Sequence, residues 1–109
     1  MNWIQLSDEK QLAEISERSK ERPQVIFKHS TRCSISSVAK NRLDKADAPK
    51  SADFYYLDLI NNRTISNFIA EQYQVTHESP QVLIIRNGEC VYDESHMGIS
   101  MQQIEAQVI

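Results

Sequence analysis

The stretch QVIFKHSTRCSISSVAK, residues 24–40, decides the fold because the hydrophobic pattern changes within it. Residues 25–27 form an unbroken apolar run, which is typical of a central strand buried on both faces. From Ser34 onward, apolar residues recur at intervals of three and four, the period of a helix. The pattern predicts a strand over residues 24–29, a turn that carries Cys33, and a helix that ends before the loop at residues 47–52.

The rest of the chain continues this alternation. Ser7 is expected to cap a first helix that runs to about Arg22, because Pro23 stops it. Residues 54–60 are rich in aromatic and branched side chains and predict a second buried strand. A helix over residues 65–73, two short strands at 82–85 and 90–92 joined by Asn87-Gly88, and a terminal helix after Gly98 complete the order.

This order predicts an α/β fold with the layout of a thioredoxin-like core. Two parallel strands linked by a right-handed crossover, followed by an antiparallel pair, give a central four-stranded mixed sheet flanked by helices. The first helix precedes that core. The 109 residues suit a single domain, residues 1–109, with no internal repeat or linker.

Composition excludes several classes of protein. The net charge of -3 and pI near 5.6 argue against nucleic-acid binding, although the basic residues concentrate in residues 1–50, the half that contains Cys33. No apolar stretch approaches the length of a membrane span, and the first residues do not resemble a secretory signal. We therefore expect a cytoplasmic protein without membrane contact. Its two cysteines are then expected to be reduced thiols.

Cys33 is the candidate nucleophile. At the start of a helix its sulfur would lie near unpaired backbone N–H groups and the positive end of the helix dipole, which favours the thiolate. Arg32, and Lys28 and Lys40 if they lie within reach, would act in the same direction. The alternative, that Cys33 is a small buried apolar residue, conflicts with the polar character of its neighbours, which include Thr31 and Ser34.

Ser36 stands where a dithiol oxidoreductase would hold a second cysteine. Its hydroxyl can donate a hydrogen bond to the Cys33 thiolate, but it cannot resolve a mixed disulfide. The segment therefore predicts monothiol chemistry. Cys90 lies between Glu89 and Val91 in the predicted hairpin, where we expect it to pack rather than react.

Ser79-Pro80 directly precedes the third predicted strand. A trans proline would simply mark the start of that strand. In thioredoxin folds, however, a cis proline at this place packs against the nucleophile. We therefore expect a cis bond, with the N–H and C=O of Ser79 available to a bound thiol beside Cys33.

The three histidines carry weaker signals. His96, just before Gly98, is expected near the active-site end, where it could contact an acidic ligand or remain a solvated loop residue. His29 and His77 are weaker candidates still, and the scattered spacing predicts no metal site. Ala39 stands where a phosphatase loop would need arginine, and no histidine is singled out as the partner of a cysteine hydrolase.

The segments FKHSTRCSIS (27–36), ESPQ (78–81) and SHMGIS (95–100) resemble the monothiol bacilliredoxin family, also called bacillithiol-system YtxJ-like proteins. The resemblance covers nearly the whole chain, and its most specific part is the HST-x-C-x-IS pattern. The family often has proline directly after the cysteine, where this chain has Ser34. The Cys-Gly-Phe-Ser pattern of cluster-carrying monothiol glutaredoxins is not matched, which disfavours cluster transfer.

The resemblance implies an enzyme of the stress response, a thiol–disulfide oxidoreductase that removes bacillithiol from S-thiolated client proteins. Bacillithiol would be a co-substrate rather than a bound cofactor, and the protein is expected to be a monomer. Cys33 and Ser36 would form the catalytic pair, and the thiol-binding residues would be Thr31, Arg32, Ser34, Ser79, Pro80 and His96. Two alternatives remain open: a non-catalytic binding or redox-sensor module of the same fold, and an oxidoreductase that uses another small thiol.

Overall fold

The computed structural model describes residues 2–108. In chain order the elements are β1 (Ile4–Gln5), α1 (Lys10–Arg18), β2 (Gln24–His29), α2 (Ser34–Lys45), β3 (Asp53–Asp58), α3 (Arg63–Tyr73), β4 (Gln81–Arg86), β5 (Glu89–Ser95), the 3₁₀ turn η1 (His96–Gly98) and α4 (Met101–Val108).

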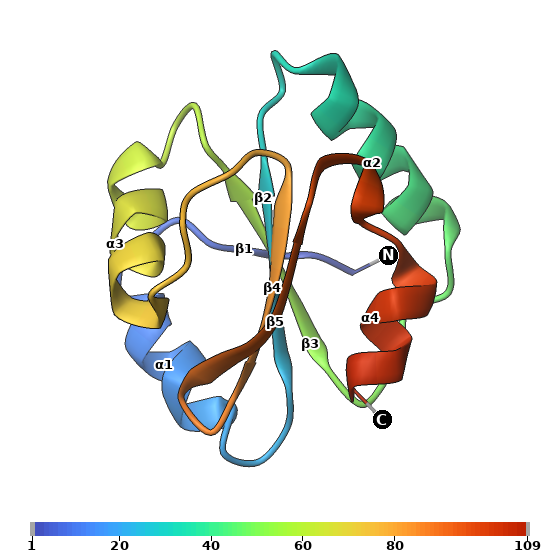
Figure 1. Cartoon of the computed structure of the whole chain (residues 1–109). Coiled ribbons are helices and arrows are strands. Elements are labelled where there is room, and N and C mark those ends of the chain that lie inside the picture. The colour runs from blue at the N-terminus through green and yellow to red at the C-terminus, as the bar shows by residue number, and fades with distance from the viewer. Residues whose placement is uncertain (1, 109) are drawn as a thin grey trace.

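Within residues 2–108 the strands form one five-stranded mixed sheet in the order β1-β3-β2-β4-β5. Strands β1, β3 and β2 run parallel, and β4 lies antiparallel to both β2 and β5. Figure 1 shows the sheet nearly edge-on, with α1 and α3 on one side and α2 and α4 on the other. This is the predicted thioredoxin-like α/β fold.

Strand β2 lies at the centre of the sheet, and alternate residues along it enter different cores. Ile26 belongs to the core beneath α1 and α3, whereas Val25 and Phe27 belong to the core beneath α2 and α4. Every residue of β2 is buried, as the unbroken apolar run predicted. The same alternation sends Lys28 and His29 to opposite faces.

The sheet has one strand more than the four predicted. Ile4 and Gln5 pair in parallel with Tyr55 and Tyr56 at the edge of β3. Two residues are too few to show a strand period in the sequence, so the prediction missed β1.

The first helix is shorter than predicted and is not capped by Ser7. It spans Lys10–Arg18, and the residue before it, Glu9, makes no side-chain capping bond. The Gln11 side chain instead accepts hydrogen bonds from the backbone N–H groups of Ser7 and Asp8, at 2.9 and 3.0 Å. A glutamine one turn into the segment thus satisfies the donors that a serine cap would have served.

The hairpin prediction is confirmed. Asn87 and Gly88 have φ angles of 52° and 75°, the positive values that a type I′ turn requires. The strands on either side are longer than predicted, because Gln81, Arg86 and residues 93–95 extend the pairing. In residues 2–108 we find no helix with the length and apolar character needed to cross a membrane.

Candidate functional site

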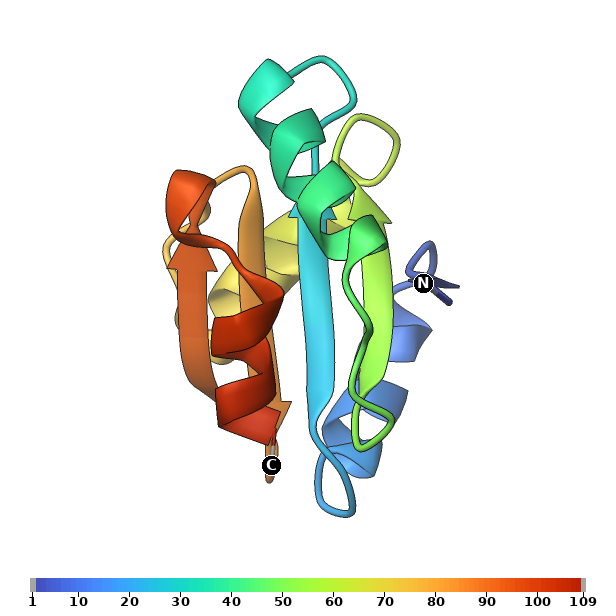
Figure 2. The same cartoon turned by 90° about the vertical axis from the view of Figure 1, so that its right-hand side faces the viewer.

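Cys33 lies at the junction that the sequence pattern indicated, between the end of β2 and the start of α2. It is the N-cap residue of α2, with an extended backbone (φ -107°, ψ 122°), and its carbonyl accepts the first helical hydrogen bond, from Ser37 N at 3.0 Å. Its own N–H donates to Ser30 O at 3.1 Å, which closes a tight loop. The thiol is free and half-buried. Figure 2 shows this loop at the end of the molecule where β2 and β3 finish.

Ser36 anchors the loop through hydrogen bonds to His29 and Ser30 rather than through one to Cys33. Its side chain is buried, and its Oγ accepts a hydrogen bond from Ser30 N at 3.0 Å and lies 2.7 Å from His29 Nδ1. When Nδ1 carries no proton, the Ser36 hydroxyl donates to it. The donor that we expected at the Cys33 thiolate is therefore directed to His29 in this structure.

His29 lies under the first turn of α2 in an aromatic cluster. It stacks on Phe27 with a centroid distance of 5.8 Å and contacts the Tyr56 ring at 5.6 Å. Burial is the main cause that lowers the pKa of His29, and the nearby ammonium of Lys40 acts in the same direction. The imidazole is thereby biased toward its neutral form.

Two lysines that we expected to support a thiolate have other partners. Lys28 lies on the opposite face of β2, fully buried, with Nζ 3.4 Å from His77 Nδ1. Lys40 donates to Asp44 at 2.6 Å and lies over the Tyr56 ring. Strand alternation and an i,i+4 ion pair explain both departures. Arg32 is the cation next to Cys33 in sequence, and it is exposed.

The Ser79–Pro80 peptide bond is cis, as predicted. Among residues 2–108, neither the N–H nor the C=O of Ser79 has a hydrogen-bond partner. The carbonyl of Pro80 accepts from His96 N at 3.0 Å, which ties η1 to this segment. The His96 side chain lies 3.4 Å from Glu78 Oε2, so its acidic neighbour belongs to the chain itself.

The other predicted thiol-binding residues surround Cys33 at the surface. Thr31, Arg32 and Ser34 are exposed, and Ser34 is the first residue of α2. Two exposed apolar residues were not predicted as part of the site: Ile35 on the first turn of α2 and Met97 on η1, which packs against α2.

Cys90 packs, as predicted, and lies far from Cys33. It is half-buried against the core beneath α1 and α3, and its thiol lies 3.2 Å from Tyr92 O. Burial raises the pKa of Cys90, which disfavours a reactive thiolate. Cys90 is paired with Ile85, which lies opposite Gln24 at the beginning of β2, whereas Cys33 follows the end of that strand. The two thiols therefore lie at opposite ends of the sheet.

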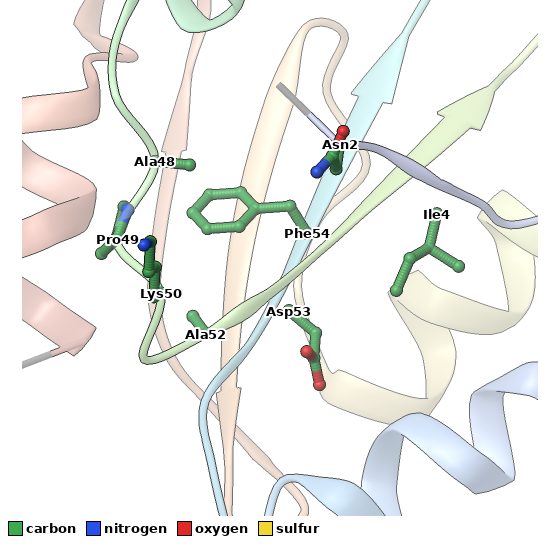
Figure 3. Close-up of a pocket in the computed structure, with 8 residues that line it drawn as sticks. All are labelled: Asn2, Ile4, Ala48, Pro49, Lys50, Ala52, Asp53 and Phe54. Atoms are coloured by element: carbon green, nitrogen blue, oxygen red, sulfur yellow. The ribbon is translucent and has the colours of Figure 1, made fainter.

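Other features of the described residues do not add to this site. No group of three or more His, Cys, Asp or Glu residues in residues 2–108 is arranged to hold a metal ion. A hollow of about 470 Å³ lies between the chain start, β3 and the loop before it (Figure 3). Its wall at Asp53 and Phe54 is where β3 begins, the end of the sheet opposite to Cys33.

The family model for monothiol bacilliredoxin BrxC matches residues 4–104. The chain belongs to the monothiol bacilliredoxin family. A solved structure described as an oxidoreductase with a thioredoxin fold is similar at 32% identity, with a TM-score of 0.82, over 94% of this chain and 90% of that one. The thioredoxin of Malassezia sympodialis shows the same fold at 14% identity and a TM-score of 0.73, over 97% of this chain and 87% of its own. The thioredoxin of Fasciola hepatica does so at 19% identity and a TM-score of 0.71, over 94% and 93%.

This member of the bacilliredoxin family is thus a thiol–disulfide redox protein of thioredoxin fold. Cys33 is the N-cap residue of α2, and the buried Ser36 stands where a dithiol protein has its second cysteine. The positioning role of His29 was missed from the sequence, although the alternation of β2 could have directed it to the α2 face.

Proposed function

We propose that this protein removes bacillithiol from S-bacillithiolated client proteins through Cys33 alone. The observation that carries the proposal is the combination of a half-buried Cys33 at the N-cap of α2 with Ser36 at the fourth position. Backbone N–H groups at a helix start stabilise negative charge on a nearby sulfur. A serine three residues later gives no thiol to form an internal disulfide.

The reaction is an exchange in which no electrons are gained or lost overall. The Cys33 thiolate attacks the bacillithiol sulfur of the client disulfide, and the existing S–S bond breaks as the new one forms. The electron pair leaves with the client sulfur, which departs as a thiolate. Cys33 now carries bacillithiol, and the thiolate of a second thiol attacks the bacillithiol sulfur to release Cys33.

The residues around Cys33 support docking of a client protein with its bacillithiol sulfur facing the Cys33 thiolate. The unpaired backbone groups of Ser79 offer one donor and one acceptor to an extended client segment. Ile35 and Met97 offer exposed apolar surface, and Thr31, Arg32 and Ser34 offer polar contacts to the leaving sulfur or to the small thiol.

We also propose a cellular location, a co-substrate and an oligomeric state for the protein. Thiol–disulfide exchange needs reduced thiols, which the cytoplasm maintains, so we place the protein in the cytoplasm. We propose that the reaction restores thiolated proteins after oxidative stress. Bacillithiol is a co-substrate here and no bound cofactor takes part. The protein is proposed to act as a monomer on thiolated client proteins, without nucleic acid or membrane.

The experiment is a rate measurement on a model protein carrying one bacillithiol adduct, with free thiol release as the signal. Cys33→Ser is expected to abolish release, while the matched variant Cys90→Ser keeps the wild-type rate. The same model protein carrying glutathione instead tests which small thiol is preferred. Equal rates for Cys33→Ser and wild type would falsify the proposal, and a faster reaction with the glutathione adduct would reassign the thiol.

A further inference from the structure

A small cavity of about 70 Å³ lies beside α3 at the Cys33 end of the sheet. Its lining residues are Leu59, Arg63, Ser66, Asn67 and His77. Two of them link it to the active-site segments, because Leu59 N donates to His29 O at 2.9 Å and His77 precedes the cis proline by three residues. The volume exceeds the share of one water, about 30 Å³, and so has room for a small charged group.

A buried ammonium stands directly behind this cavity. Lys28 has no exposed surface, and its Nζ lies 3.4 Å from His77 Nδ1. Ser66 Oγ lies 3.1 Å from the same nitrogen. Because an ammonium can only donate, Nδ1 is the acceptor and the proton of a neutral His77 is on Nε2.

The positive groups around the cavity lack negative partners. Among residues 2–108, neither Lys28 nor Arg63 has a carboxylate within the 4.0 Å of an ion pair. Glu78, which follows His77 in the sequence, is paired with His96 instead. A buried cation without a counter-ion is costly, and an anion placed nearby recovers part of that cost.

A second buried group nearby is also unsatisfied. Gln81 is the neighbour of Lys28 across the β2–β4 pairing, and its side-chain Oε1 is buried without a hydrogen-bond partner within the described chain. The Nε2 group of Gln81 already donates a hydrogen bond to Thr76 O, at 3.0 Å. An unpaired amide oxygen needs a hydrogen-bond donor, so a water, and not the anion itself, would satisfy Gln81 Oε1 beside Lys28.

We propose that this cavity binds a carboxylate, namely the acid group of the low-molecular-weight thiol that Cys33 exchanges. The Arg63 guanidinium and the Asn67 amide donate to it at the rim, and Lys28 acts through His77 as the positive charge behind it. The assignment to the thiol rests on the proposed function, whereas anion binding itself does not. The cavity would hold the small thiol by its acid while its sulfur reacts.

The site predicts a specific pH dependence. Burial lowers the pKa of Lys28 to about 8, and Cys90 is the titratable group that opposes this shift. The groups that face His77 are Lys28, Glu78 and Arg63. Burial lowers the pKa of His77, which keeps this side chain neutral above pH 7, and burial raises the pKa of the Cys90 thiol. Anion binding should therefore weaken as pH rises through about 8, because Lys28 then loses its proton.

The first arm of the test measures binding by amide chemical-shift titration of the whole protein with succinate. Succinamide is the neutral control, and Arg42→Gln, on exposed α2 surface, is the control for Arg63→Gln. Arg63→Gln is expected to weaken succinate binding about tenfold or more, the worth of a charged hydrogen bond. Lys28→Met is expected to remove the pH dependence. Equal affinities of the two arginine variants, or equal binding of succinamide, would overturn the proposal.

The second arm measures exchange with two adducts of one model protein, formed with mercaptosuccinate and with 2-mercaptoethanol. Arg63→Gln is expected to raise KM for the acidic adduct only. If succinate binds at Arg63 but KM rises equally for both adducts or for neither, the cavity takes a free anion and the assignment to the thiol is wrong. If Cys33 exchanges with neither of these adducts nor with the bacillithiol adduct, the proposed function fails and that assignment falls with it, while the first arm still decides anion binding. If Cys33 exchanges with the bacillithiol adduct alone, an unchanged KM for that adduct in Arg63→Gln overturns the assignment to the thiol.

Discussion

His29 Nδ1 lies 2.7 Å from Ser36 Oγ, and this contact joins the last residue of β2 to the first turn of α2 directly beneath Cys33. The same hydroxyl holds the backbone of Ser30, whose carbonyl in turn receives the Cys33 N–H. The reactive loop is therefore fixed by buried hydrogen bonds rather than by contacts to the thiol itself.

Ser36→Ala should destabilise the protein and slow exchange. It leaves the buried His29 Nδ1 and the partly buried Ser30 N–H without a partner, which costs about 1–3 kcal/mol in the free energy of unfolding. Chemical denaturation and the exchange rate at Cys33 measure the two effects. Ser37→Ala, one residue along the same helix, is the matched control and should have little effect on either. Equal stability of the two variants would contradict the anchoring role of Ser36.

Stability should fall as the solution is acidified below about pH 6.5, in part because of His29. Its folded pKa is lowered from 6.5 by burial, so the unfolded chain binds the proton more readily in the window below that value. His29→Gln should flatten the decline between pH 7 and 5 measured by urea denaturation. His77 has a lowered pKa for the same main reason, so His77→Gln measures its separate share. An unchanged slope in His29→Gln would show that His29 does not titrate in this way.

Lys28→Met should change the dependence of stability on alkaline pH. The wild-type ammonium has a pKa of about 8 against 10.5 in the unfolded chain, so wild-type stability gains from Lys28 as pH rises above 8. The full gain is about 3 kcal/mol at most. Denaturation at pH 7.5 and 9.5 should show about 2 kcal/mol of this gain in wild type but none of it in Lys28→Met. Identical gains in both proteins would show that a group other than Lys28 loses its proton in this pH range.

Ser34→Pro should be tolerated and should stabilise the chain. Ser34 is the first residue of α2, where proline is favoured, and the φ and ψ angles of Cys33 suit a residue that precedes proline. The expected gain is about 0.4–1 kcal/mol. A rise of a few degrees in Tm, with exchange retained, would agree with this. A lower Tm would contradict the expected fit of proline at the first position of α2.

The site could be placed from the sequence because one change of period marks it. The apolar run before His29 and the helical spacing after Ser34 leave Cys33 no place except a strand-to-helix turn. The Asn87-Gly88 turn could be predicted equally well, because few other residue pairs adopt positive φ angles at both positions.

Contacts that depend on three-dimensional direction could not be predicted in the same way. Lys28 and His29 are adjacent in sequence, but strand alternation sends one to the α3 layer and the other to the α2 layer. The capping of α1 by Gln11 and the two-residue strand β1 depend on pairings that leave no period in the sequence. Local patterns give the positions of elements, whereas side-chain partners depend on how the layers meet.

The most direct measurement is intact-protein and peptide mass spectrometry after mixing the reduced protein with an S-bacillithiolated model protein. The account predicts one bacillithiol on the peptide that contains Cys33, none on Cys90, and a client released as free thiol. A disulfide between Cys33 and the client sulfur as the main product, or a client that keeps its bacillithiol while Cys33 remains free, would contradict it.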